Sequence, residues 1–412
     1  MIIRRLWTIS AFAIAAGLAT PLVAASPDPA AVQARLLPFD VHLDIDTTFD
    51  STGQPAGADG TTQFDLVKAK RGGIKAVALA IFVPQAQESP EQLAAVRQTA
   101  ERKLHIIAGL ATRYPKQVGI AHSPAELRSI AASGRLAVVE SIVNGGAFID
   151  SLADLDRWQR DGVRIFGFVH AGHNRLADSS RPAAPRGEGT SRNDGLSSLG
   201  RQAVGRLNDL GVLIDVSQLS DAAFDDVLRL TRVPVIASHS DVRALVPAGR
   251  NLTDPQLLAL KASGGVIALN AFSAYLHPPS EATKAALAAL QSEFGIKDGS
   301  TASLSADREA DYARRSHEIQ AQEPKATVAD LADALDHAVK LIGIDHVALS
   351  SDFNHGGGVV GWGDESEAAN VTAELLRRGY SEADLAKIWS GNVLRIWGQA
   401  QAGASTAAHE GH

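Results

Sequence analysis

Cysteine is absent from the 412 residues of this sequence. The chain therefore has no disulfide framework, no lipid-modified cysteine and no thiolate ligand for a metal ion. Any bound metal must be held by histidine, aspartate, glutamate or carbonyl oxygen. Because a chain of this length buries a large core without disulfides, the absence of cysteine is compatible with an oxidising compartment.

The sequence also lacks runs of lysine and arginine. Its formal net charge is −7 at pH 7, and its basic residues are scattered along the chain. A protein that binds nucleic acid usually carries a clustered basic patch. We therefore predict no nucleic-acid partner.

Long apolar runs are scarce, and one of them lies within the first 25 residues. Arg4 and Arg5 precede an apolar stretch over residues 11–19, and small residues lead up to Ala25. The stretch is short for a membrane span, and the pattern is typical of a secretory signal peptide. We predict a signal peptide at residues 1–25 and an exported protein, periplasmic or secreted, with no stable membrane span after cleavage. An uncleaved anchor is the alternative.

The remaining sequence alternates apolar or β-branched runs with amphipathic segments, which is typical of strand-helix units around a parallel sheet. Helices are expected between the strands, for example over residues 90–114 and 199–210. Eight strands alternating with helices predict an α/β fold, a (β/α)8 TIM-type barrel spanning residues 26–400 as one catalytic domain. The predicted strands lie at residues 39–45, 76–83, 136–142, 165–170, 212–217, 233–238, 265–270 and 346–351.

Two connections are long. Residues 178–194 are polar and rich in Gly, Pro and Ser, which predicts an exposed loop. Residues 277–324 form an insertion with highly charged, helical sequence over residues 307–320. Such insertions serve as lids or binding loops, or are solvated excursions without function, and both interpretations stay open. Residues 401–412 are small and polar, and we predict a disordered tail.

His42 and Asp44 are two residues apart in the first predicted strand. Successive strand side chains point to opposite faces, so these two stand side by side. An imidazole nitrogen and a carboxylate oxygen aimed at one point suit zinc. The alternative is a half-buried strand whose polar face meets solvent.

Polar residues also stand where five of the predicted strands end. A single such residue is more often structural or a helix cap. Five in register, added to the pair in the first strand, favour a functional site, because burying several ionisable groups together is costly without a metal or substrate. In a barrel the active site lies at this end of the strands. The five are Glu140, His170, Gln218, His239 and Asp352.

Short motifs follow one another along residues 38–397. In order and spacing they resemble the membrane dipeptidase (renal dipeptidase) family of zinc peptidases, whose barrels are of the metal-dependent hydrolase type. The motifs include Asp40-Val41-His42-Leu43-Asp44, Val169-His170 with Asn174, Ile214-Asp215-Val216-Ser217, Ser238-His239-Ser240, Arg250-Asn251-Leu252-Thr253-Asp254 and Ser351-Asp352-Phe353.

This resemblance implies a site for two zinc ions. One ion would be bound by His42 and Asp44, and Glu140 would bridge to a second ion completed by His239 and residue 218. The family has histidine at that last position, whereas this chain has Gln218. A carboxamide holds zinc less well than imidazole does. Gln218 as a weak ligand, water in its place and a single bound zinc are therefore all open.

The resemblance further implies hydrolysis of dipeptides by a metal-activated hydroxide. His170 would stabilise the oxyanion, Asp352 would bind the substrate amine and move protons, and Arg250 would pair with the substrate carboxylate. Phe272 stands where the family has an aromatic hydroxyl, and Asn354 stands where an acidic residue is usual.

These departures leave other functions open. One is a related amidohydrolase acting on another small amide, such as an N-acyl amino acid. A non-catalytic binding protein that retains the barrel is a third reading. The expected partner is a small-molecule dipeptide or amide, and a homodimer is a candidate assembly.

Overall fold

The structure is a computed structural model, and it describes residues 28–85, 88–183, 188–296, 304, 306–320 and 322–410. The predicted signal peptide at residues 1–25 lies outside this range. None of the helices in the described part is long and apolar enough to cross a membrane.

Eight parallel strands form a nearly closed barrel, as the sequence predicts. Their order around the sheet is β1-β2-β4-β5-β6-β7-β8-β9, and a short β3 pairs with β4 outside this path. The ring closes where Asp352 N donates to His42 O at 3.0 Å and Asp44 N donates to Phe353 O at 2.9 Å. The strands are β1 (Phe39–Asp44), β2 (Ala76–Phe82), β3 (Val118–Ile120), β4 (Leu136–Val143), β5 (Ile165–Gly167), β6 (Leu213–Asp215), β7 (Ile236–Ser240), β8 (Val266–Asn270) and β9 (Val347–Ser350).

Alternation along each strand divides the core into two clusters. In β4, Ala137 and Val139 belong to the cluster that fills the barrel, whereas Val138 and Ile142 belong to the larger cluster under the helices. Both faces of a parallel strand are therefore apolar, as expected for a sheet covered by helices. The barrel interior is filled by packed side chains rather than by a pore.

Helices surround the barrel, and local sequence defines their first turns. For example, α3 begins after Ser89, whose side chain accepts a hydrogen bond from Gln92 N, and proline occupies the first turn. The helices predicted at 90–114 and 199–210 are α3 and α6. The helices are α1 (Pro29–Arg35), α2 (Leu66–Arg71), α3 (Pro90–Arg113), α4 (Pro124–Ala132), α5 (Leu152–Arg160), α6 (Ser198–Asp209), α7 (Asp221–Leu230), α8 (Asp254–Ala262), α9 (Ser273–Leu276), α10 (Glu281–Phe294), α11 (Ala306–Gln320), α12 (Val328–Ile342), α13 (Ala369–Arg377), α14 (Glu382–Ala386) and α15 (Asn392–Glu410).

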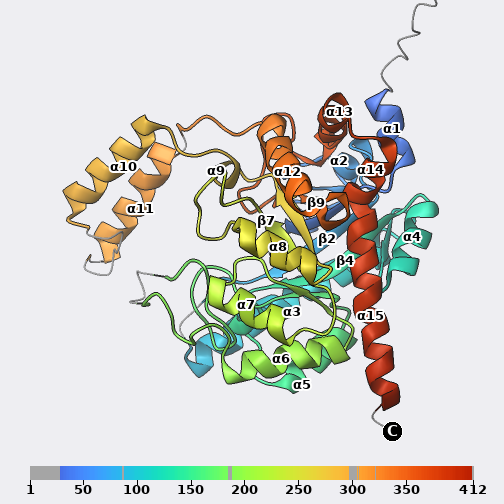
Figure 1. Cartoon of the computed structure of the whole chain (residues 1–412), viewed down its shortest axis with the longest axis horizontal. Helices are drawn as coiled ribbons and strands as arrows, with labels where there is room; N and C mark the ends of the chain where they lie inside the picture. Colours follow the sequence, from blue (N-terminus) through green and yellow to red (C-terminus); the bar gives the residue numbers. More distant parts are fainter. Residues whose placement is uncertain are drawn as a thin grey trace, which may run out of the picture.

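Within the insertion at 277–324, helices α10 and α11 pack against each other, and the pair extends away from the barrel in Figure 1. Helical structure in its charged part was expected. The tail prediction is wrong over residues 401–410, because α15 continues through Glu410. Gln401 Nε2 donates to His122 O at 2.7 Å, which ties this extension to the loop before α4.

The amino ends of the strands carry structural contacts. Arg395 of α15 donates to Asp345 O at 2.6 Å and to Gly264 O at 3.3 Å, just before β9 and β8. His346 Nδ1 lies 2.8 Å from Gly265 O. His346 thus lies at the structural end of the barrel. The opposite end, where the strands and their following loops meet, is called the barrel mouth below.

Candidate active site

Three predicted residues come together at the barrel mouth: His42, Asp44 and Asp352. His42 Nε2 lies 3.5 Å from Asp44 Oδ2 and 3.9 Å from Asp352 Oδ1. One donor atom of each residue lies within 4.8 Å of the others, and all three residues are buried. The closure between β1 and β9 brings them together, because Asp352 lies two residues after the end of β9. We call these three residues the donor triad.

The donor triad suits a divalent metal ion. A catalytic zinc takes three protein ligands and keeps one position open. Asp44 Oδ1 is buried and has no hydrogen-bond partner among the described residues. A buried carboxylate oxygen without a partner is costly unless a cation compensates it. The residues present therefore fit a metal ion at this point.

Asp352 is held by two neighbours. Asn270, the last residue of β8, donates from Nδ2 to Asp352 Oδ2 at 3.0 Å. Arg250 Nη1 lies 4.0 Å from the same oxygen. Oδ1 of Asp352 therefore faces the donor triad while Oδ2 faces Asn270 and Arg250. Asn270 was not among the predicted site residues, although it ends its strand just as the predicted ones do.

Gln218 and His239 are hydrogen-bonded to each other. Gln218 Nε2 lies 2.6 Å from His239 Nε2, and Gln218 Oε1 accepts from Arg181 Nη2 at 2.6 Å. Because arginine only donates, the oxygen of Gln218 must face Arg181 and its NH₂ must face His239. His239 Nε2 is then an acceptor, and its Nδ1 donates to Ser238 Oγ at 2.7 Å. Ser238 Oγ in turn donates to Asp215 Oδ2 at 2.6 Å.

The pKa of His239 agrees with this neutral state. Burial, the charge of His42 and the charge of Arg250 hold it well below the ordinary histidine value. The rings of His239 and His42 stack with centroids 3.8 Å apart and planes inclined by 9°. Both Gln218 and His239 thus lie beside the donor triad, with their ligand atoms already hydrogen-bonded.

Arg181 connects this pair to His170. Its Nη2 lies 3.1 Å from His170 Nε2, and its Nη1 donates to the Tyr275 hydroxyl at 3.1 Å. Burial, followed by the charge of Arg181, lowers the pKa of His170 to about 2. His170 is therefore neutral, with its Nε2 lone pair facing the guanidinium. Neither Arg181 nor Tyr275 was predicted as a site residue.

Arg250 also contacts Tyr275 at the mouth, at the ring rather than at the hydroxyl. Its guanidinium carbon lies 4.5 Å from the centroid of the Tyr275 ring, and its Nη2 donates to His239 O. The side chain is buried, and its Nε has no hydrogen-bond partner among the described residues. Two guanidinium groups therefore contact Tyr275, that of Arg250 at the ring and that of Arg181 at the hydroxyl.

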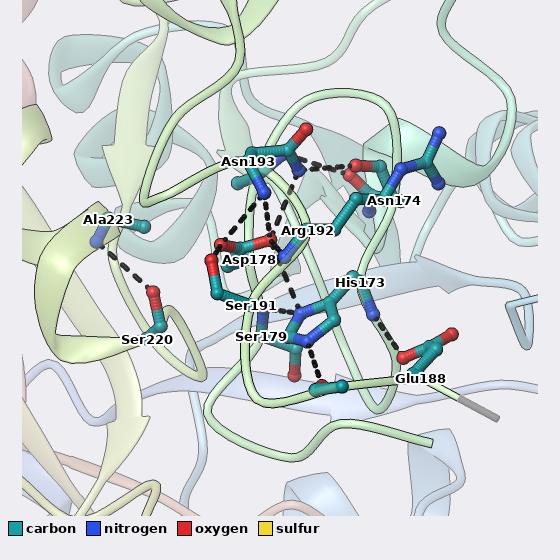
Figure 2. Close-up of polar contacts among 12 residues, drawn as sticks. His173, Asn174, Asp178, Ser179, Glu188, Ser191, Arg192, Asn193, Ser220 and Ala223 are labelled. Carbon is teal, nitrogen blue, oxygen red and sulfur yellow. Dashed lines mark hydrogen bonds and ion pairs between the residues drawn. The ribbon is translucent and has the colours of Figure 1, made fainter. Parts of the chain in front are cut away.

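The loop that carries His170 and Arg181 is held by the carboxylate of Asp178 (Figure 2). Asp178 accepts from Ser191 Oγ at 2.6 Å and from the backbone N of Arg192 and Asn193 at 3.0 Å each. The residues predicted as an exposed loop at 178–194 thus begin with a buried anchor. Residues 184–187 of this loop lie outside the described part.

His173 supports the same loop. Its Nδ1 accepts from Ser179 N at 3.1 Å, and its Nε2 lies 3.0 Å from Gly189 O (Figure 2). Ser179 Oγ donates to the backbone oxygen of His170. These contacts fix the backbone on both sides of the segment from His170 to Arg181, which places both side chains at the mouth.

Glu140 is not part of this site, so its predicted role as bridging ligand is wrong on geometry. It shares the outer face of β4 with Val138 and Ile142, and it pairs with Leu79 of β2. A Cβ at Gly162 would lie 1.7 Å from Glu140 Oε2. The carboxylate therefore points into the helix layer, against the turn after α5.

The residue that follows β4 at the mouth is Asn144. It is buried with φ of 60°, donates to Val83 O at 2.9 Å and accepts from Asn174 Nδ2 at 3.1 Å. Asn144 therefore serves to join the loops after β2, β4 and β5. It contributes an amide where a bridging carboxylate was expected.

The model of the membrane dipeptidase family, peptidase family M19, matches residues 28–410. This chain belongs to that family. The probable dipeptidase PvdM from Pseudomonas aeruginosa superimposes with a TM-score of 0.89 at 44% identity, covering 91% of this chain and 98% of that one. Dipeptidase aclJ of Aspergillus oryzae is 28% identical over 82% of this chain and 70% of its own length. Dipeptidase tcpJ of Claviceps purpurea is 28% identical over 85% and 71%.

Membership of the membrane dipeptidase family makes this chain a hydrolase of the metallo-dipeptidase type, with a small peptide as the class of substrate. The family is one of metallopeptidases, and the buried donor triad fits its metal requirement. The fold and the family predicted from the sequence are both confirmed.

Two departures from the family pattern receive a structural explanation. Phe272 stacks on Tyr275 with ring centroids 4.5 Å apart, so an aromatic hydroxyl is supplied three residues later. Asn354 donates from Nδ2 to Asp44 O at 3.0 Å, while its Oδ1 accepts from Gln63 N at 3.0 Å. Asn354 thus clamps the backbone of a donor-triad residue.

Replacing Glu140 with glutamine is expected to leave metal content unchanged and to alter the pH dependence of stability. Burial raises the pKa of Glu140 to about 7, from 4.5 for an exposed glutamate. The folded state therefore holds this proton more tightly than the unfolded state, and stability falls as pH rises from about 4.5 through about 7.

The difference in unfolding free energy between Glu140→Gln and wild type should shift in favour of the variant by up to about 3 kcal/mol across this window. Urea unfolding between pH 4.5 and 8 measures it. If Glu140→Gln lost its bound zinc, Glu140 would be a metal ligand and the position given to it here would be wrong.

Proposed function

We propose that this chain hydrolyses the amide bond of dipeptides, using one zinc ion held by His42, Asp44 and Asp352. The observation that supports this most directly is the donor triad, with a buried Asp44 oxygen that has no partner among the described residues. One ion rather than two is proposed because Gln218 and His239 direct their ligand atoms at each other and at Arg181.

When bound, zinc supplies a Lewis acid that activates water near neutral pH. The oxygen of water forms a bond to the carbonyl carbon, and the π electrons move onto the carbonyl oxygen. Asp352 Oδ1 faces the metal position, so Asp352 Oδ2, which Asn270 orients, takes the proton of the water. The electrons on the oxyanion then re-form the carbonyl as the C–N bond breaks, and Asp352 gives the proton to the leaving nitrogen.

Arg250 is proposed to pair with the substrate carboxylate. Its buried guanidinium is oriented by the Tyr275 ring and by His239 O, and it keeps an Nε–H without a partner in the described part of the chain. Guanidinium and carboxylate form paired, charge-assisted hydrogen bonds. A substrate carboxylate paired with Arg250 limits the number of substrate residues that fit beyond the scissile bond.

An N-acyl amino acid is the second candidate substrate. Asp44 and Asp352, the two described carboxylates nearest His42, both belong to the donor triad. A dipeptide amine would therefore have to share Asp352 with the metal, whereas an N-acyl group needs no anionic partner. Export through the leader at residues 1–25 and a homodimer belong to this proposal on sequence grounds alone.

Purified mature protein should hydrolyse members of a dipeptide panel, lose this activity to a chelator and regain it with zinc. Ala-Ala and N-propionyl-Ala form a matched pair, because they differ only in the free amine. Faster turnover of the acylated compound would select the second candidate. No turnover of either class with one zinc bound would overturn the proposed function.

A further inference from the structure

The guanidinium group of Arg181 places a positive charge beside Gln218 and His239. Arg181 Nη2 contacts Gln218 Oε1 and His170 Nε2, and Arg181 Nη1 contacts the Tyr275 hydroxyl. Arg181 forms no ion pair with a described carboxylate, and its side chain is partly buried. A partly buried cation held only by neutral groups is poised to meet an anion.

The contacts of Arg181 also consume the ligand atoms that a second metal would need. Gln218 Oε1 accepts from Arg181, which turns the Gln218 NH₂ onto His239 Nε2 at 2.6 Å. One guanidinium thus engages Gln218 directly and His239 through Gln218. A second metal at this point would have to displace these bonds and approach a fixed positive charge.

His170 cannot be the donor to an oxyanion through Nε2 in this arrangement. That nitrogen faces Arg181 Nη2 at 3.1 Å, and arginine has no acceptor, so the nitrogen accepts. The low pKa of His170 keeps it neutral, in agreement with this geometry. Of the five N–H bonds of Arg181, three have acceptors in the described structure, which leaves donors for a ligand.

We propose that Arg181 takes the place of a second metal ion: it supplies the positive charge beside Gln218 and His239 and donates to the oxyanion formed from the scissile carbonyl. This inference rests on the proposed function. His170, Gln218 and Tyr275 act as positioning residues that orient the guanidinium. The negative charge that moves onto the carbonyl oxygen during attack is thereby met by a fixed donor rather than by solvent.

The test compares wild type with Arg181→Met and Arg181→Lys, and uses Arg192→Met as the control. Arg192 lies in the same loop, but its side chain is exposed and pairs with Glu88. Each protein is saturated with zinc, desalted and assayed for metal per chain. Binding of a phosphinate dipeptide analogue, whose tetrahedral anion imitates the oxyanion, is measured by calorimetry.

We expect one zinc per chain in all four proteins. Phosphinate affinity should fall by about 100-fold or more in Arg181→Met, fall less in Arg181→Lys and stay unchanged in Arg192→Met. Arg181→Met should lower kcat on the best dipeptide substrate far more than it raises KM. Two zincs in wild type, equal phosphinate affinity in Arg181→Met, or no phosphinate binding by zinc-loaded wild type would each overturn the inference.

Turnover is recorded in parallel, so the two proposals fail separately. If wild type hydrolyses dipeptides and Arg181→Met leaves phosphinate affinity and kcat unchanged, the proposed function stands and the proposed role of Arg181 is wrong. If wild type binds one zinc and binds the phosphinate through Arg181 but hydrolyses no dipeptide, the anion site at Arg181 stands and the proposed function is wrong.

Discussion

Replacing Asp44 with asparagine is expected to empty the metal site and to lower dipeptide hydrolysis by about 10³-fold or more, since the metal contributes several kcal/mol to the transition state. Asp44 Oδ2 lies 3.5 Å from His42 Nε2, and Asp44 Oδ1 has no described hydrogen-bond partner. Asparagine keeps the shape of the side chain but removes the negative charge that holds the cation.

Metal content after dialysis and kcat/KM check this prediction. Asp46→Asn is the matched control, because Asp46 is exposed, lies two residues further along and bonds Thr48. The control should retain its zinc and its activity. An Asp44→Asn protein that keeps one tightly bound zinc would show that the metal lies elsewhere.

Asp352→Asn should weaken zinc binding, so that loading needs excess zinc, and the loaded protein should turn over about 10³-fold more slowly. General acid-base groups contribute about 10²–10⁴-fold to a rate. Asp352 Oδ1 faces His42, and Asn270 orients Oδ2, so this carboxylate is placed to move the proton from water to the leaving nitrogen. Asparagine can accept hydrogen bonds but cannot carry that proton.

Kinetics at saturating zinc separate this effect from weakened metal binding. If Asp352 served only as a ligand, excess zinc would restore kcat to Asp352→Asn. Asp345→Asn is a suitable control, because Asp345 is near the amino end of β9 and pairs with Lys387 at 2.8 Å. That variant should match wild type in both zinc affinity and kcat.

The barrel could be predicted because each strand is an apolar run of its own. Apolar runs bounded by helices specify a strand without regard to which face points inward, and all eight predicted runs overlap a strand of the barrel. The same property explains the error at Glu140. The apolar residues of β4 lie on both of its faces, namely Ala137, Val138, Val139 and Ile142. The sequence of β4 therefore does not indicate which of its side chains face the barrel interior.

The donor triad was accessible in part. His42 and Asp44 lie two apart in one strand, which places them on one side by local geometry alone. Asp352 follows a strand end, and the ring closure brings it to His42. By contrast, Arg181 lies in a polar loop without periodicity, and only long-range contacts with Gln218 and Tyr275 assign it to the site.

Anomalous X-ray diffraction at the zinc edge, on crystals grown with zinc, tests the central claim most directly. We predict one anomalous peak per chain, at coordination distance from His42 Nε2 and from carboxylate oxygens of Asp44 and Asp352. Arg181 should remain against Gln218 in the same map. A second peak between Gln218 and His239, or no peak at the donor triad, would contradict this account.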